Sequence, residues 1–278
     1  MLTATRPCLV SLSAALMSVA GVFAATANAN DSSATVTLER DDNAGVLKAS
    51  IDGREAFVYR YGTEGDLPHF WPLRSPSGKN MLTQQAEPYP HHRAFWFADT
   101  VQLAGRRKAS FYAALYSGES NRPPFQDRVC HEAFLSIESG TFGKYRETLV
   151  WLMDRDVPVL NERRDVRIVP LGSGEYLLDI TFTLTAAHGD VTFRSDPVHY
   201  AWPYLRINDT YNGAHGGTIT NDLGQTGQKA TNMQPARWVD YSNTVEGVSE
   251  GVAVFQWSKA GDAPVRWLTR EYGTFGPR

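Results

Sequence analysis

Cysteine is almost absent from this chain of 278 residues, which has only Cys8 and Cys130. Cys8 lies in a segment that we expect to be removed, so the remaining chain cannot form an internal disulfide and depends on packing for its stability. Cys130 follows Val129 in a strand-like run, where a lone cysteine is more often a small buried hydrophobic residue than a catalytic thiol.

The sequence also lacks a basic stripe and a helical apolar pattern. Its 27 Lys and Arg residues and 30 Asp and Glu residues give a formal net charge of −3, which is ordinary for a soluble surface. Nucleic acid is therefore not an expected main partner. Outside the first 29 residues, no window of about a dozen residues shows a clean helical stripe, which excludes a helical bundle.

One long apolar run is present, from Leu9 to Ala25, and it follows the basic residue Arg6. The run is followed by Ala27-Asn28-Ala29, the small-x-small pattern that signal peptidase accepts. We therefore predict that residues 1–29 are a signal peptide and that residues 30–278 are exported to the periplasm or beyond. A membrane anchor is less favoured, because about 17 residues rich in Ala and Ser are marginal for crossing roughly 30 Å of hydrocarbon. No later segment is predicted to span a membrane.

Apolar residues alternate with period two in segment after segment of the mature chain. This pattern predicts an all-β, antiparallel β-sandwich that forms a single domain over residues 30–278. It also predicts that less than about a tenth of the mature chain is helical.

A hairpin is the strongest local prediction. The runs Val46 to Ile51 and Ala56 to Tyr61 flank Asp52-Gly53, a pair that readily adopts the positive φ angles of a two-residue turn. Four longer runs are predicted to form a meander with one face of each strand on the core. These runs are residues 133–138, 145–153, 162–169 and 176–185.

Two segments, residues 117–126 and 208–234, are predicted to be loops because Gly, Pro and polar residues gather in them. Loops as long as the second are usually functional or disordered.

The densest cluster of polar and aromatic residues is residues 89–99, which include His91, His92, Arg93 and Trp96. If a strand begins at Arg93, alternation places His92 and Trp96 on one face and Arg93 on the other. His91 and His92 are then predicted to point in opposite directions, so at most one of them enters a cleft. We favour His92 as the catalytic member, because Trp96 would offer a sugar ring a stacking surface beside it.

Two further segments add planar polar groups and aromatic rings. A sugar ring stacks its C–H faces on aromatic side chains while planar polar groups bind its hydroxyls, so these residues are predicted to bind substrate. Core packing is the alternative for each aromatic residue, and we expect most of the seven tryptophans to serve only that purpose. The candidates are His199, Tyr200 and Arg206 in the first segment, and Asn221, Trp238 and Asp240 in the second.

Four ordered segments make the chain resemble the PmoA-like family, which is labelled methane oxygenase PmoA. They are Pro90 to Arg93 with Trp96-Phe97, Gly217 to Asn221, Trp238 to Ser242, and Tyr272 to Phe275. The resemblance covers most of the mature chain. It implies a secreted β-sandwich domain, often encoded among carbohydrate-degrading functions of bacteria, without a well-established activity.

The family label does not fit the sequence. A particulate methane monooxygenase subunit is built of membrane-spanning helices, and none is predicted after the signal peptide, so methane oxidation is not expected. Family members usually continue with further strands after the Tyr272 to Phe275 segment, so a chain that stops at Arg278 is expected to be shortened at its C-terminus.

An enzyme that acts on acidic oligosaccharides is the first functional hypothesis. Histidine suits proton transfer near neutral pH, so His92 or His91 is the predicted general acid/base of a lyase or dehydratase. Arg93 and Arg206 would bind the anionic group, and Asp99 or Asp240 would orient a histidine. Hydrolysis by a pair of carboxylates is less favoured, because no Glu stands in these segments.

A non-catalytic carbohydrate-binding or interaction module is the alternative, and it shares every feature except the titrating group. A cleft that unites the histidines with Arg93 and an acid would favour the enzyme, whereas a flat exposed aromatic platform would favour the module. The sequence requires no cofactor. Adjacent histidines on opposite faces are poor joint metal ligands, but a divalent metal is possible if Asp196, His199, Asp99 and Asp240 converge.

Overall fold

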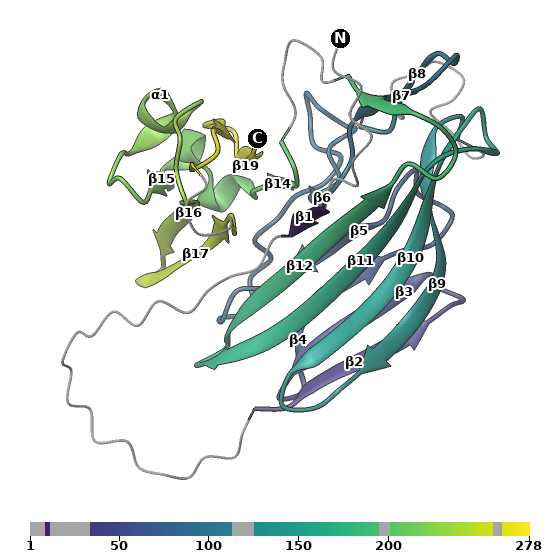
Figure 1. The fold of residues 1–278 in the computed structure, drawn as a ribbon. Coiled ribbons are helices and arrows are strands. Elements are labelled where there is room, and N and C mark those ends of the chain that lie inside the picture. The colour runs from purple at the N-terminus through teal and green to yellow at the C-terminus, as the bar shows by residue number, and fades with distance from the viewer. Residues whose placement is uncertain (1–8, 12–33, 113–124, 195–200, 258–262) are drawn as a thin grey trace.

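The computed structural model describes residues 9–11, 34–112, 125–194, 201–257 and 263–278 (Figure 1). Strands make up 55% of the structure and helices 5%, which confirms the predicted all-β class and the low helix content. Every strand pair in the sheets is antiparallel.

The first large sheet has five strands in the order β1-β12-β11-β10-β9. Its last four strands are the predicted meander, which is confirmed. The first strand lies within the predicted signal peptide, so cleavage after Ala29 would remove it. The strands are β1 (Leu9–Ser11), β9 (Arg128–Glu138), β10 (Gly143–Met153), β11 (Val157–Gly172) and β12 (Glu175–Thr185).

The second large sheet has eight strands in the order β18-β19-β14-β6-β5-β4-β3-β2, so it combines strands from residues 36–60 with the last two strands of the chain. The strands are β2 (Val36–Asp41), β3 (Val46–Ile51), β4 (Arg54–Arg60), β5 (His69–Leu73), β6 (Phe95–Trp96), β14 (Tyr204–Arg206), β18 (Trp267–Thr269) and β19 (Thr274–Pro277). The predicted hairpin joins β3 to β4, with φ of 50° at Asp52 and 75° at Gly53.

Two three-stranded sheets complete the described structure. One contains β7 (Thr100–Leu103), β8 (Lys108–Ser110) and β13 (Val191–Phe193). The other contains β15 (Thr218–Asn221), β16 (Trp238–Val245) and β17 (Val248–Phe255). The helical pieces are η3 (Asp209–Tyr211), η4 (Gly213–His215) and α1 (Gly227–Thr231).

The predicted loop at residues 208–234 is therefore only partly correct, since it contains β15 and α1. The strand β15 was not predicted because this segment is mostly polar. Ile219 is the apolar residue of β15 that packs on the core. Most of the other predicted loop, residues 117–126, lies outside the described residues.

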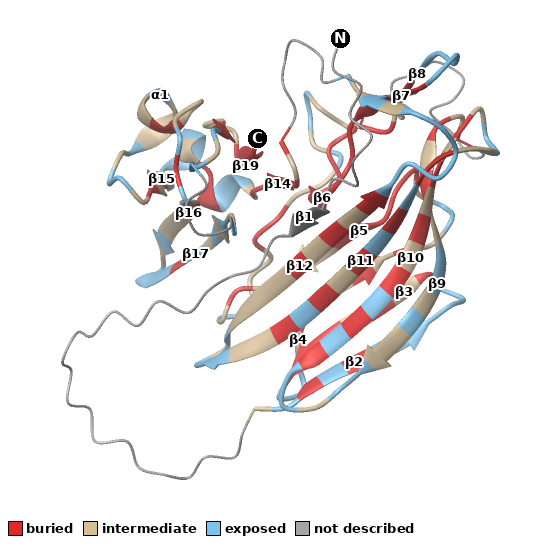
Figure 2. Ribbon diagram, in the orientation of Figure 1, coloured by how far each residue is buried: buried red, intermediate tan, exposed pale blue. Residues whose placement is uncertain are grey.

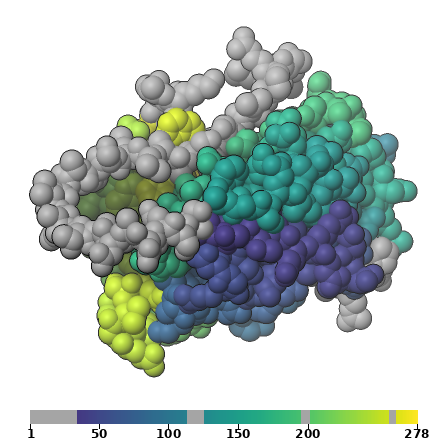
Figure 3. Space-filling view, turned by 90° about the horizontal axis from the view of Figure 1, so that it is seen from below, coloured from purple at the N-terminus to yellow at the C-terminus, as the bar shows by residue number. Residues whose placement is uncertain are grey.

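The two large sheets face each other and enclose the core of a β-sandwich. Burial alternates along β10, and the buried stripes on the long strands are visible in Figure 2. Tyr59 of β4 lies 5.6 Å from Tyr145 of β10, measured between ring centroids, which joins the two layers. Figure 3 shows the purple strands β2 to β4 against the teal strands of the first sheet, with the C-terminal segments at one end.

Alternation also places charged residues inside the sandwich. Glu147 accepts hydrogen bonds from Tyr59 at 2.5 Å and is bonded to the His131 ring at 2.6 Å. Arg164 forms an ion pair with Glu162 at 2.7 Å and donates a hydrogen bond to Tyr59 at 2.9 Å. Because Tyr59 of the facing sheet is bonded to both Glu147 and Arg164, the network ties the layers together.

Among the described residues, no helix is long and apolar enough to cross a membrane. Cys130 is free and half-buried, and burial raises the pKa of its thiol, so the residue does not have the lowered pKa of a reactive cysteine.

Candidate functional site

A turn, rather than a strand, carries the two adjacent histidines. The amide of His92 donates to the carbonyl of Tyr89 at 3.0 Å, and Ala94 has a φ of 87°. The strand β6 therefore starts only at Phe95. The ring centroids of His91 and His92 lie 4.5 Å apart, so the prediction that these side chains point in opposite directions is wrong. Period-two alternation does not apply across a turn with a left-handed residue.

Aromatic rings surround the histidine pair. Tyr89 stacks on His92 with centroids 5.1 Å apart, and Tyr112 lies edge-on to His91 at 5.1 Å. Trp96 lies 5.2 Å from His92, as predicted, but it is only 1% exposed and its indole stacks on Tyr204 at 4.9 Å. Trp96 is therefore a buried wall of the cluster and presents no open stacking surface.

His92 connects this turn to β14 and β19. Its Nε2 lies 3.1 Å from the hydroxyl of Tyr112, and its Nδ1 lies 3.4 Å from Oγ1 of Thr274. Nη1 of Arg206 donates to the same Oγ1 at 3.3 Å. The arrangement thus brings together His92 and Arg206, two residues predicted for the site, with Thr274 as the group between them.

The guanidinium of Arg206 is buried and has no acidic partner among the residues that the structure describes. It lies over the ring of Tyr272, 4.4 Å from the centroid, and its residue is 3% exposed. Within the described ranges, no carboxylate is at ion-pair distance from Arg206, and its shielded Nε has no hydrogen-bond partner. The shielded Nε1 of Trp96 also lacks an acceptor there. Two orphaned buried donors are unusual, since most such groups are satisfied.

The pKa values of both histidines are lowered. Burial lowers the pKa of His91 to about 4, with a further effect from the charge of Arg93. Burial lowers the pKa of His92 to about 2, helped by His91 and Arg206. Burial also lowers the pKa of Arg206 itself. Both imidazoles are therefore neutral at pH 7, and an anion bound beside them would raise their pKa values.

Arg93, in contrast, is already paired. Its Nη2 lies 2.6 Å from Oδ1 of Asp66 and its Nε donates to the same oxygen at 2.8 Å, and both side chains are buried. The carboxylate of Asp66 neutralises the guanidinium charge of Arg93, which we had predicted to bind an anionic substrate. Arg93 thus holds the histidine turn against the segment before β5 rather than offering an unpaired charge.

Asp99 lies immediately before β7 and is fully buried. Its Oδ1 accepts a hydrogen bond from the amide of Thr100 at 2.7 Å, and its Oδ2 accepts one from Nε1 of Trp202 at 2.8 Å. These contacts fix the chain after β6. His199 and Tyr200, two other predicted site residues, lie outside the described residues.

The third predicted group lies on the small sheet of β15, β16 and β17. Asp240 accepts a hydrogen bond from Ser242 at 2.7 Å, and burial raises the pKa of its carboxyl. Its neighbour Tyr241 packs on Phe275 of β19, with ring centroids 4.4 Å apart. Alternation therefore directs Asp240 to the face of β16 that is turned away from β19.

Trp238 shares that face of β16, and its ring lies 6.3 Å from the ring of Phe255. Asn221 uses its side chain within its own loop: Oδ1 accepts from the amides of Leu223 and Gln225, and Nδ2 donates to Oε1 of Gln225. This network closes a turn and accounts for the burial of Asn221 without a ligand.

A comparison with family models matches residues 47–278 to a family of unknown function, DUF6807. The chain belongs to this family. Searches of curated proteins and of solved structures gave no match. Membership of DUF6807 fixes no activity, and the resemblance to the PmoA-like family stays a prediction.

In this DUF6807 member, the cluster contains Tyr112, which the sequence did not point to, and Tyr89 and Thr274, which stood in named segments without a role. Tyr272 stood in one of the four segments that carry the resemblance, but it was given no role. The fold brings such residues next to the histidines from distant parts of the chain; Thr274, for example, stands 182 positions after His92. Among the described residues, no group of three His, Cys, Asp or Glu side chains is placed to hold a metal ion.

Proposed function

We propose that this protein is exported and acts as a lyase or dehydratase on acidic carbohydrates at the site formed by His91, His92 and Arg206. The guanidinium of Arg206, which has no counter-ion among the described residues, carries the proposal. A buried cation without a counter-ion is costly, and a carboxylate is the group that a guanidinium binds best. A uronic acid supplies that carboxylate together with hydroxyl groups for Nε1 of Trp96.

Elimination follows from the groups beside Arg206. Pairing of the substrate carboxylate with the guanidinium would acidify the proton on the adjacent carbon. The His92 and Tyr112 pair would take up this proton, while a double bond forms to the next carbon and the bond from that carbon to its oxygen substituent breaks. The same pair would return a proton to the leaving oxygen, so that protons balance.

The lowered pKa of His92 is consistent with this role. A neutral imidazole at a pKa of about 2 is a weak base, but the negative charge of a bound carboxylate raises that pKa toward the working pH. The base would therefore gain strength only when an acidic substrate occupies the site. Neutral sugars would leave His92 ineffective, which gives selectivity for acidic substrates.

The packing of the rings supports the enzyme over the binding module. Around His92 the aromatic side chains are buried or half-buried and stack on one another, so they form no flat exposed platform. Tyr89 and Tyr272 are half-exposed and lie 5.2 Å apart over His92 and Arg206. Rings at this distance are in contact, so we expect a ligand to reach His92 and Arg206 only when the two rings move apart.

A substrate screen tests the proposal. The exported protein is incubated with oligosaccharides of uronic acids and with neutral oligosaccharides of the same length, each with and without a chelator. We expect ultraviolet absorbance from a new carbon–carbon double bond with uronic acid substrates only. Binding of acidic and neutral sugars with equal affinity, and without product, would contradict the proposal and favour the binding module.

A further inference from the structure

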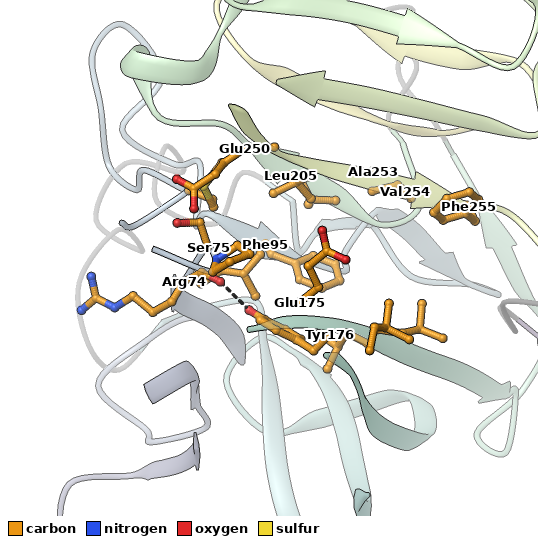
Figure 4. A pocket seen from close by; sticks show the side chains of 18 of the residues that line it. Arg74, Ser75, Phe95, Glu175, Tyr176, Leu205, Glu250, Ala253, Val254 and Phe255 are labelled. Carbon is orange, nitrogen blue, oxygen red and sulfur yellow. Dashed lines mark hydrogen bonds between the residues drawn. The ribbon is translucent and has the colours of Figure 1, made fainter. Parts of the chain in front are cut away.

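A second cleft, separate from the histidine site, lies between β12 and β17 (Figure 4). Its volume is about 440 Å³, which is within the range of ligand-binding clefts. Leu205 and Phe95 lie at its base, and the hydroxyl of Tyr176 donates to the carbonyl of Arg74 at one end. The histidine cluster does not line it.

Two strand edges border this cleft. Within the described residues, Glu175–Ile180 of β12 pair only with β11, and β17 pairs only with β16. Each free edge presents a row of backbone N–H and C=O groups with no strand partner. Such edges are templates for a further strand, and proteins usually cover or shorten them.

The structure already seats a strand on the β12 edge. Leu9–Ser11 of β1 pairs antiparallel with Thr181–Thr183, which follow Glu175–Ile180 directly and include the cleft-lining residue Phe182. This contact shows that the edge accepts an extended segment from a distant part of a polypeptide. If residues 1–29 are removed on export, the whole β12 edge becomes free.

The lining of the cleft defines the chemistry of a partner. Leu178 and Val254 are only half-buried, although both are large and apolar. Glu175 is exposed at one end, and Oδ1 of Asp179 is shielded from solvent without a hydrogen-bond partner in the described structure. Arg167, opposite Asp179 on β11, instead lies over the Phe142 ring, 4.9 Å from its centroid.

We propose that the cleft between β12 and β17 binds an extended peptide segment as an added β-strand, with alternating apolar side chains and a basic residue facing Asp179. Backbone hydrogen bonds to the β12 edge would supply affinity, and the apolar lining with the two acids would supply specificity. The proposal does not depend on the activity of the histidine site.

Peptide binding to the full chain tests this proposal. The probe is a fluorescein-labelled peptide, Lys-Val-Thr-Val-Thr-Val-Thr-Lys, and the matched control has the same sequence with alternate backbone amides N-methylated. Fluorescence anisotropy measures both affinities, and we expect N-methylation to weaken binding by about tenfold or more because it removes hydrogen bonds to the strand edge.

Variants locate the binding site. Ala253→Trp fills the cleft from β17, whereas Val248→Trp places the same side chain at an exposed position of β17 outside the cleft. We expect Ala253→Trp to weaken probe binding by about tenfold or more and Val248→Trp to leave it unchanged. Asp179→Asn should weaken binding of the Lys-containing probe and leave a probe with Ser in place of Lys unaffected.

Three results would overturn the proposal. One is equal binding of the probe and its N-methylated control, which would indicate a site for apolar molecules without strand pairing. Another is a concentration-dependent dimer that Ala253→Trp abolishes, which would make a second copy of the chain the occupant. The last is the absence of probe binding to the folded full chain and to Asp179→Asn alike.

Discussion

Replacing the two buried arginines near the histidine turn should have very different effects on stability. Arg206 has no acidic partner among the described residues, whereas Arg93 is paired with Asp66 at 2.6 Å. Arg93→Met leaves the buried carboxylate of Asp66 unpaired, which should lower the free energy of unfolding by about 3–5 kcal/mol. The matched substitution Arg206→Met removes an unpaired charge instead.

The contributions at Arg206 nearly cancel. Loss of its contact with the Tyr272 ring costs about 1–2 kcal/mol, and loss of the hydrogen bond to Thr274 about 1.5–3 kcal/mol. Removal of a buried unpaired guanidinium recovers several kcal/mol of desolvation. We therefore expect the free energy of unfolding of Arg206→Met to lie within about 1 kcal/mol of that of the parent.

Urea unfolding of the parent and both variants measures these differences. The midpoints can be compared directly if the slope of the unfolding free energy against urea concentration is the same for all three proteins. Arg206→Met should also abolish any stabilisation of the protein by uronic acid oligosaccharides. If Arg206→Met destabilises the protein as much as Arg93→Met does, then Arg206 is a structural residue and the interpretation of its charge as a ligand site is wrong.

Three other predictions follow from separate features. The exported protein should begin at Asn30, and N-terminal sequencing that finds Met1 would contradict the signal peptide. Burial lowers the pKa of His69 to about 4, so the folded state binds fewer protons than the unfolded state between pH 4 and 6.5. His69 alone should therefore lower stability by about 3 kcal/mol as the pH drops through this window, and His91 and His92 should add to the fall. His69→Gln should lessen the fall in urea unfolding, and a pH profile identical to the parent's would refute the prediction. Arg164→Met should lose about 3–5 kcal/mol in urea unfolding because it leaves Glu162 buried and unpaired, and a neutral effect would show that the core network is not needed.

The strands could be predicted because their information is local. Alternation in β10 and β12, and the Asp52-Gly53 turn, depend on neighbouring residues and on the period of a pleated strand. Even the inward position of Glu147 follows from that period, although its partner Tyr59 stands 88 residues away.

The geometry of the site could not be predicted, because it depends on one backbone angle and on distant pairs. The positive φ at Ala94 ends the alternation that we had extended through His92. The partner of Arg93 is 27 residues away, and that of His92 is 182 residues away. The sequence pattern predicted that histidine and arginine side chains lie in one region. It did not predict that Asp66 neutralises Arg93 and that Arg206 has no acidic partner among the described residues.

Turnover by His92 variants tests the central claim most directly. The assay follows double-bond formation from a uronic acid oligosaccharide by the parent, by His92→Ala, and by the control His69→Ala, which replaces another buried histidine bonded to Gln84. We expect His92→Ala to lose about 10²-fold or more in kcat, and His69→Ala to keep its turnover, when both are assayed well below their melting temperatures. Full turnover by a folded His92→Ala variant would contradict the account.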